Sequence, residues 1–150
     1  MCIRDRSHVI ARKLTATDAD TAMFAGIVHE AGGFYLLSRA DEIPGLLDDP
    51  DDWMGAAHEI IAREMMRKMM IPEPVSLAIV SLRGATLTPP PLGLRDTLLI
   101  AKRLAPVASP FAPAQEHAGL DGFVDDNAAL EQMLAESAEE AASMSAALLV

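Results

Sequence analysis

The sequence has few aromatic residues, a single cysteine and no long apolar run. Aromatic residues make up 4% of the 150 residues, and Cys2 is the only thiol, so an internal disulfide is excluded. A membrane-spanning helix needs roughly 20 consecutive apolar residues, and no such run occurs. The N-terminus also lacks an apolar signal core. We therefore expect a cytoplasmic protein that is neither a disulfide scaffold nor a membrane protein.

Basic residues are in the minority. The chain has 12 Lys and Arg against 22 Asp and Glu, which gives a formal net charge of -10. A surface of this sign repels phosphate backbones, so nucleic acid is not expected as a partner. The cluster Arg63, Arg67 and Lys68 has helical spacing, and we interpret it as a solvated helix face.

The residues that are abundant favour helices. Ala, Leu, Met and Glu have high helix propensity, whereas runs of β-branched residues are few. A hydrophobic content of 51% is sufficient for one core of ordinary size. The sequence therefore predicts an all-α fold, a compact multi-helix bundle in one domain.

Glycine separates the first two helices of the prediction. Asp18 or Asp20 can cap a helix that ends near His29, because a short carboxylate accepts from free N–H groups of the first turn. The Gly32–Gly33 pair is expected to interrupt this helix, since glycine permits positive φ. A second short helix is predicted over residues 34–40.

Proline separates the later helices. Pro44-Gly45 and the acidic stretch 48–52 are expected to form a linker, with a cap at Asp51 or Asp52, before a long helix that Pro72 and Pro74 stop. Two further helices are predicted over 75–82 and 94–104. The predicted inward face of the long helix holds Trp53, Ala57, Ile60, Ile61, Met65 and Met69. The predicted inward face of the last of these helices holds Leu94, Leu98, Ala101 and Leu104.

His29 and Glu30 form the most informative pair in the sequence. Imidazole and carboxylate are both good ligands for Zn, Mn or Fe, so the pair fits a metal site. A histidine beside a helix break is otherwise a hydrogen-bonded structural residue. His58, near the start of the long helix, has the same two interpretations, as a third ligand or as a residue that hydrogen-bonds a loop or water.

The surroundings of both histidines resemble the HDOD domain, a catalytically degenerate branch of the HD superfamily. Residues 25–34, AGIVHEAGGF, resemble the stretch in which a His-Asp pair closes one helix and the next one opens. Residues 53–62, WMGAAHEIIA, are similar to the HDOD segment in which Gly and His precede an amphipathic helix. That helix ends in an apolar-Pro pair, here Ile71-Pro72. The resemblance covers roughly His8 to Phe111.

The resemblance implies a regulatory domain of bacterial signal transduction that acts by binding. In active HD enzymes, histidines and aspartates on separate helices hold metal, which activates a water molecule. This chain has Glu30 in place of Asp, Ser81-Leu82 where later histidines would fall, and Lys102 in place of the closing Asp. A protonated lysine cannot coordinate metal. We therefore expect no cofactor, no bound metal and no catalysis.

Binding is then assigned to a pocket and to a surface. The pocket of His29, Glu30, His58 and Lys102 is predicted to bind a small ligand or to be vestigial, and a helical surface is predicted to contact a protein partner. Two alternatives stay open. One is a metal-dependent phosphohydrolase of the HD superfamily in which Glu30 replaces Asp, and the other is a helical oligomerisation module, suggested by the alanine-rich end of the chain.

The resemblance also divides the chain. Residues 1–6, MCIRDR, resemble a translated sequencing adapter and are set apart from the fold. The helices that normally precede His8 are then expected to be missing, and residues 7–111 to be the C-terminal part of an HDOD-like domain. Residues 112–124 are predicted to be a connection and residues 125–150 a C-terminal helix.

Overall fold

The protein is built from short helices. The computed structural model describes residues 2–46, 48–49, 57–88, 90–105, 107, 109–111, 132, 134–136 and 138–139. These residues contain helices and no strand, which confirms the all-α prediction. The elements are α1 (Ile3–Ile10), the π-helical turn η1 (Ala11–Thr15), α2 (Ala19–Val28), α3 (Ala31–Ser38), α5 (His58–Lys68), α6 (Glu73–Val80) and α7 (Gly93–Arg103).

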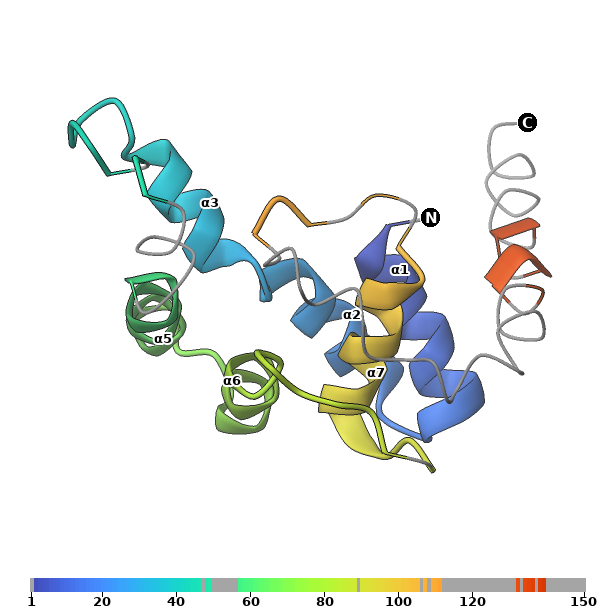
Figure 1. Ribbon diagram of the computed structural model, residues 1–150. Helices are drawn as coiled ribbons and strands as arrows, with labels where there is room; N and C mark the ends of the chain where they lie inside the picture. Colours follow the sequence, from blue (N-terminus) through green and yellow to red (C-terminus); the bar gives the residue numbers. More distant parts are fainter. Residues whose placement is uncertain are drawn as a thin grey trace, which may run out of the picture.

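The helices form two neighbouring groups. α1, α2 and α7 pack together in one, and α3, α5 and α6 lie beside them in the other (Figure 1). α2 leads directly into α3, and α6 contacts both α5 and α7, so the two groups are joined. None of the described helices is both long enough and apolar enough to span a membrane.

α7 lies at the centre and is buried on more than one side. Leu98 and Leu99 belong to a core cluster that α2, α5 and α6 share, whereas Ile100 and Ala101 belong to a second cluster with Ile10. Leu98 and Ala101 are fully buried, as predicted for the inward face. The sequence predicted one inward face for this helix. α7 is instead apolar around most of its circumference, because it packs against helices on opposite sides.

Two polar side chains of α7 are buried with their partners. Thr97 is fully buried, and its hydroxyl lies 2.6 Å from the hydroxyl of Thr15 in η1. Asp96 is 4% exposed and accepts a 2.8 Å hydrogen bond from the backbone N–H of Leu92, at the start of the helix. Both groups therefore satisfy the requirement that a buried polar atom be hydrogen-bonded.

α1 begins earlier than the sequence suggests. Its first residue is Ile3, so most of the segment set apart as adapter-derived is helical and continuous with the residues that follow. Ser7 and Ile10 are fully buried, because α1 packs against α2 and α7. The origin of residues 1–6 stays a prediction.

The break between α2 and α3 differs from the prediction. Asp18 caps α2 as expected, its carboxylate accepting from the N–H of Thr21 at 2.7 Å. α2 ends at Val28 and α3 begins at Ala31, so the interruption lies at His29 and Glu30. The predicted break at Gly32–Gly33 is wrong, and both glycines lie in the first turn of α3.

Close packing explains the two glycines. A Cβ atom on Gly32 would lie 2.8 Å from the Cβ of Ala62 in α5, and one on Gly33 would lie 2.7 Å from the ring of Phe111. Contacts this short are not tolerated between carbon atoms. The glycines therefore allow α3 to approach its neighbours closely. This packing outweighs the cost of a glycine in a helix, which is about 0.5–1 kcal/mol relative to alanine.

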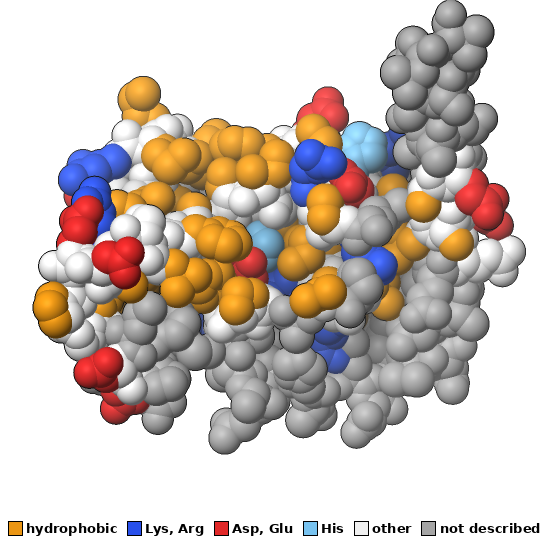
Figure 2. All heavy atoms as spheres, turned by 90° about the horizontal axis from the view of Figure 1, so that it is seen from above, with side chains coloured by type: hydrophobic (Ala, Val, Ile, Leu, Met, Phe, Trp, Pro, Cys, Tyr) orange, Lys and Arg blue, Asp and Glu red, His pale blue; other side chains and the backbone are white. Residues whose placement is uncertain are grey.

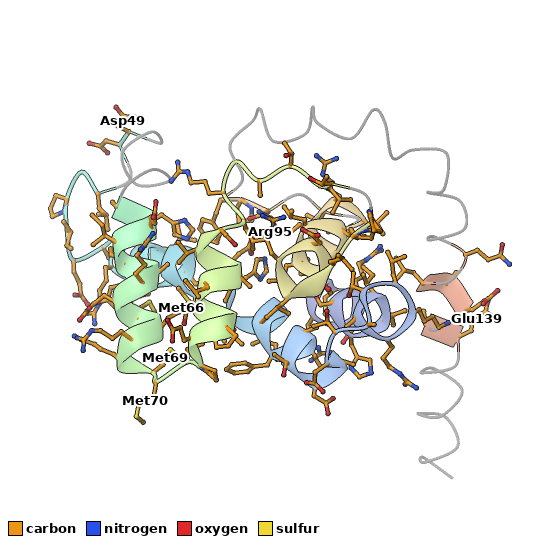
Figure 3. The ribbon with its side chains drawn as sticks, turned by 90° about the horizontal axis from the view of Figure 1, so that it is seen from below. Asp49, Met66, Met69, Met70, Arg95 and Glu139 are labelled. Carbon is orange, nitrogen blue, oxygen red and sulfur yellow. The ribbon has the colours of Figure 1, made fainter. Side chains whose placement is uncertain are left out.

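The inward face of α5 is also different from the predicted one. Ile60 is 66% exposed and Met69 is 53% exposed, whereas Met66 is buried and packs with Ala62 against the core. Figure 3 shows Met66 between helices and Met70 pointing away from them. The predicted residue Trp53 and the caps Asp51 and Asp52 lie outside the described residues.

The boundaries around the prolines shift by a few residues. α5 ends at Lys68, and Met70 adopts a left-handed conformation with φ of 53° while the N–H of Ile71 bonds the carbonyl of Met66 at 2.9 Å. α6 then starts at Glu73 and includes Pro74 in its first turn, where no N–H is needed. The predicted start at residue 75 is therefore two residues late.

The outer face of α5 is solvated, as predicted. Arg63 pairs with Glu59 and Arg67 pairs with Glu64, each at 2.6 Å, and these side chains are largely exposed. The predicted connection 112–124 lies outside the described residues. Of the predicted C-terminal helix, the described residues are helical, and Leu134 is buried against the second core cluster.

The packing of α3 on α5 predicts that Gly32→Ala destabilises the fold. The new methyl group overlaps Ala62, and overpacking of this kind lowers the free energy of unfolding by about 1–3 kcal/mol. Urea unfolding followed by circular dichroism measures the change. Ala62→Gly should recover part of the loss in the double variant. A Gly32→Ala protein as stable as the wild type would contradict the close contact.

The threonine pair predicts a loss of stability in Thr97→Val. The variant keeps the shape of the side chain but removes the 2.6 Å hydrogen bond of the buried Thr15 hydroxyl and leaves it only the longer one to Thr17, at 3.3 Å, which costs about 1–3 kcal/mol. Thermal and urea unfolding provide the measurement. The double variant Thr15→Val, Thr97→Val should be more stable than the single one. Thr86→Val, at an exposed position, is the control and should change little.

Candidate functional site

The four residues singled out in the sequence line one cavity. Its volume is about 80 Å³. His29 and Glu30 reach it from the junction of α2 and α3, His58 from the first turn of α5, and Lys102 from the last turn of α7. The fold thus brings together residues that are more than 70 positions apart in the chain.

His29 is held in one orientation. It is 8% exposed, and its Nδ1 atom lies 2.9 Å from the carbonyl oxygen of Gly26, one turn earlier. A carbonyl oxygen only accepts, so Nδ1 carries a proton. The Nε2 atom of the same ring lines up with the carboxylate of Glu30, at 3.5 Å from Oε1. This separation is too long for a good hydrogen bond.

Glu30 stays ionised in spite of its burial. Burial by itself raises the pKa of its carboxyl group, because it disfavours the charged form. The neighbouring His29, the hydroxyl of Ser109 and the positive charge of Lys102 act in the opposite direction and hold the pKa below its ordinary value. At neutral pH the side chain is therefore a carboxylate, which accepts hydrogen bonds and donates none.

His58 is packed among aromatic rings. Its imidazole stacks on Phe111 with ring centroids 5.9 Å apart, and Phe34 meets Phe111 edge to face at 5.2 Å. Burial lowers the pKa of His58, and the positive charge of Arg83 lowers it further, although Glu30 opposes the shift. His58 is therefore neutral at physiological pH.

Three polar atoms of the residues that line the cavity are themselves fully buried. His29 Nε2, Glu30 Oε1 and His58 Nε2 have no hydrogen-bonding partner among the described residues. A buried polar atom in this condition costs about 1–3 kcal/mol. Such a concentration at one place is unusual, because nearly all buried polar atoms in native proteins are satisfied.

The charged residues around the cavity balance formally. Glu30 and Glu59 are acidic, and Arg83 and Lys102 are basic. Ala62, Ile79 and Leu82 supply apolar surface between them. The cavity thus combines an apolar wall with closely spaced polar groups, which is typical of small-molecule sites.

The residues do not fit a metal centre of the HD type. Within the part of the chain that the structure describes, no group of three or more His, Cys, Asp or Glu side chains is arranged to hold a metal ion. Nδ1 of His29 is engaged by the Gly26 carbonyl, and Leu82 presents an apolar side chain to the cavity. Ser81 donates to the Ala78 carbonyl at 3.0 Å.

A second hollow borders the same His-Glu pair. This apolar groove, of about 510 Å³, is lined by Ile3, Ile27, Phe34 and Val107 in addition to His29 and Glu30. Ile27, Phe34 and Val107 are each more than half exposed. Figure 2 shows hydrophobic side chains gathered over much of this side of the molecule.

Several residues of the site were not predicted. Ser109 and Phe111 line the cavity but follow α7 in a segment without periodic pattern, so the sequence carried no signal for them. Glu59 could have been noticed, because it follows His58 directly on α5. Arg83 lies in the turn after α6, and only its proximity to the cavity gives it significance.

The environment of His58 predicts a pH effect on stability. Its pKa is lower in the folded state than in the unfolded state, so the unfolded chain binds more protons as the pH falls below the ordinary histidine value of about 6.5. The stabilising effect of a neutral His58 is present above that pH and is lost as the pH falls through the folded pKa. His58→Gln should remove this part of the pH dependence, measured by urea unfolding from neutral to mildly acidic pH.

His8→Gln provides the matched control, because this histidine lies on α1 and does not line the cavity. The difference in unfolding free energy between the wild type and His58→Gln should change with pH over this range. If the wild type and His58→Gln had the same pH dependence of unfolding free energy, the burial of His58 would have no effect on its protonation.

The comparisons with known proteins add no relative. No protein-family model matches the chain, and no curated protein and no solved structure is similar enough to count as a match.

Proposed function

We propose that the protein is an HDOD-like regulatory domain that acts by binding and not by catalysis. One observation supports this most directly: His29, Glu30, His58 and Lys102 converge on one cavity, in which apolar side chains stand beside closely spaced polar groups. The cavity is then a ligand pocket of a cytoplasmic signalling protein.

The chemistry of the cavity favours binding over hydrolysis. A metal-dependent phosphohydrolase needs several ligands that place a metal-bound water against phosphorus. Lys102 lines the cavity where the resemblance implies an aspartate in active enzymes, and its ammonium group repels a divalent cation. Leu82 occupies the region where a later histidine is implied.

The exposed apolar surface supports a protein partner. Phe34 and Leu37 of α3 are 58% and 40% exposed, and Ile27 of α2 is 56% exposed. Neighbouring exposed apolar side chains are typical of contact surfaces. Oligomerisation through the C-terminal helix stays a prediction, because most of residues 125–150 lie outside the described ones.

The proposal predicts that the chain does not hydrolyse phosphate esters. Purified protein with Mn²⁺ should turn over p-nitrophenyl phosphate and bis-p-nitrophenyl phosphate no faster than Mn²⁺ in buffer, because the cavity residues do not form a metal site. His29→Ala should give the same rate. Metal-dependent turnover that is lost in His29→Ala would instead establish the phosphohydrolase.

Binding at the cavity is tested in parallel by screening a fragment library with protein NMR. Fragments should shift resonances of residues around the cavity. Ser109→Leu, which places a larger side chain in the cavity wall, should weaken their binding about tenfold or more, as expected for the loss of roughly 1.4 kcal/mol. Ser38→Leu is the control, because Ser38 does not line the cavity. A library without any fragment at the cavity would contradict the ligand-binding function.

A further inference from the structure

The chain folds back after α7 and closes one side of the cavity. Figure 1 shows this segment, in orange, running from the end of α7 toward the start of α3. Ser109 and Phe111 line the cavity. Ala105 and Val107, in the same segment, line the apolar groove. The segment therefore borders both hollows.

The ring of Phe111 fills a seat made by three residues. It stacks on His58 of α5 with ring centroids 5.9 Å apart, and it meets Phe34 of α3 edge to face at 5.2 Å. Gly33 makes room for the ring, because a Cβ atom there would lie 2.7 Å from it. Phe111 is only 6% exposed in this seat. Since Phe34 also lines the groove, the Phe111 ring stands between the cavity and the groove.

Ser109 ties the same segment to the α2–α3 junction. Its Oγ atom accepts a hydrogen bond from the N–H of Phe111 at 3.1 Å, and its hydroxyl donates to the carboxylate of Glu30, which helps to hold the pKa of that group down. Residues 109–111 lie outside any helix. Such segments open locally at a lower free energy than the helices of a core. We therefore expect Phe111 to leave its seat while the helices stay folded.

The closed cavity is small for a ligand. Its volume of about 80 Å³ is well below the roughly 300–1,000 Å³ that is usual for small-molecule sites. The neighbouring groove has about 510 Å³, and His29 and Glu30 line both hollows. Withdrawal of Phe111 would join the polar groups of the cavity to the apolar surface of the groove. The joined site has the size and the mixed lining that a ligand needs.

We propose, building on the ligand-binding function above, that residues 109–111 form a latch over the cavity. In the closed state the ring of Phe111 fills the seat between Gly33, Phe34 and His58. In the open state the ring leaves this seat, and the cavity joins the groove and admits a ligand. The geometry that supports this is the position of one ring between two hollows, in a segment outside the helices.

A thiol placed in the cavity measures the opening of the latch without any ligand. Leu82 is 7% exposed and lines the cavity. Leu82→Cys is combined with Cys2→Ser, so that the introduced thiol is the only one in the full chain. Its reaction with a small methanethiosulfonate reagent is followed at urea concentrations below the unfolding transition. The rate without urea should be at least about tenfold lower than in the unfolded chain, because an open minor state is sparsely populated.

The effect of urea separates opening of the latch from unfolding of the whole chain. Opening of the latch exposes little surface, so the logarithm of the labelling rate should rise with urea at less than about half the slope of global unfolding. A steeper rise would show that the cavity opens only when the fold does, and would overturn the proposal. A labelling rate as high as in the unfolded chain would overturn it as well, because the cavity would then be open already.

Removal of the ring tests the role of Phe111. In the same background, Phe111→Ala should raise the labelling rate at least about tenfold, because the open state is no longer a minor one. Phe24→Ala is the matched control, since Phe24 is a partly exposed residue of α2 that lines neither hollow. An equal acceleration in the control would show a general loosening of the fold and would contradict the latch.

Gly33→Ala displaces the ring without removing it. The added methyl group takes the place of the ring edge, so this variant should also speed labelling about tenfold or more. Circular dichroism checks that the variants fold. If Phe111→Ala unfolds, Gly33→Ala takes its place, and the urea dependence of the parent protein tests the latch even if neither variant folds. An unchanged labelling rate in either folded variant would overturn the proposal.

The outcome for the proposed function is separate, because the labelling rates are measured without a ligand. A cavity that binds fragments although its thiol reacts only through global unfolding keeps the proposed function and has no latch. A latch that opens over a cavity that no fragment enters removes the ligand-binding function instead.

Discussion

The contact between α3 and α5 is the constraint on which the cavity depends. Gly32 and Gly33 have no side chain, and this allows α3 to touch Ala62 and Phe111 at distances that exclude a Cβ atom. His58 lies one helical turn before Ala62 on the same face of α5, so this contact carries His58 to the α2–α3 junction. The packing of two glycines thus sets the distance between the two parts of the candidate site. It also explains why the glycines stand in the first turn of a helix despite their low propensity.

The central position of α7 supplies the other side of the cavity. Its Leu98 and Leu99 pack against the helices that surround the cavity, and this packing fixes the position of the last turn of α7. Lys102 follows in that turn, where a positive charge is stabilised by the negative end of the helix dipole. The helix dipole therefore favours a lysine at this position. Its positive charge also lowers the pKa of Glu30, which lines the same cavity. Helix stability and the electrostatics of the site depend on the same residue.

The sequence was sufficient for the class of the fold and for part of the site. Helix propensity, the Asp18 cap and the apolar spacing around Leu98 follow local rules, and the structure agrees with them. The wrong break at Gly32–Gly33 has a tertiary cause, since only the position of α5 reveals why the glycines are there. On α5 the periodic pattern predicted Met65 and Ile60 as inward residues, but Met66 is the methionine buried in the core. The pattern could not separate them, because consecutive methionines make several faces of the helix similarly hydrophobic. Phe111 belongs to no periodic segment, and its place against His58 depends on the chain folding back after α7.

The unpaired atoms at His29 and Glu30 connect stability with binding. Each lowers the stability of the free fold, since hydrogen bonds to water are given up on folding and not replaced within the described residues. The Gly26 carbonyl engages Nδ1 of His29 and holds the ring, so Nε2 stays 3.5 Å from the Glu30 carboxylate. A ligand bound in the neighbouring cavity adds its binding free energy to the stability of the native state. The junction that weakens the free protein therefore borders the cavity where binding would stabilise it. A chain selected for stability alone would place apolar side chains at this junction.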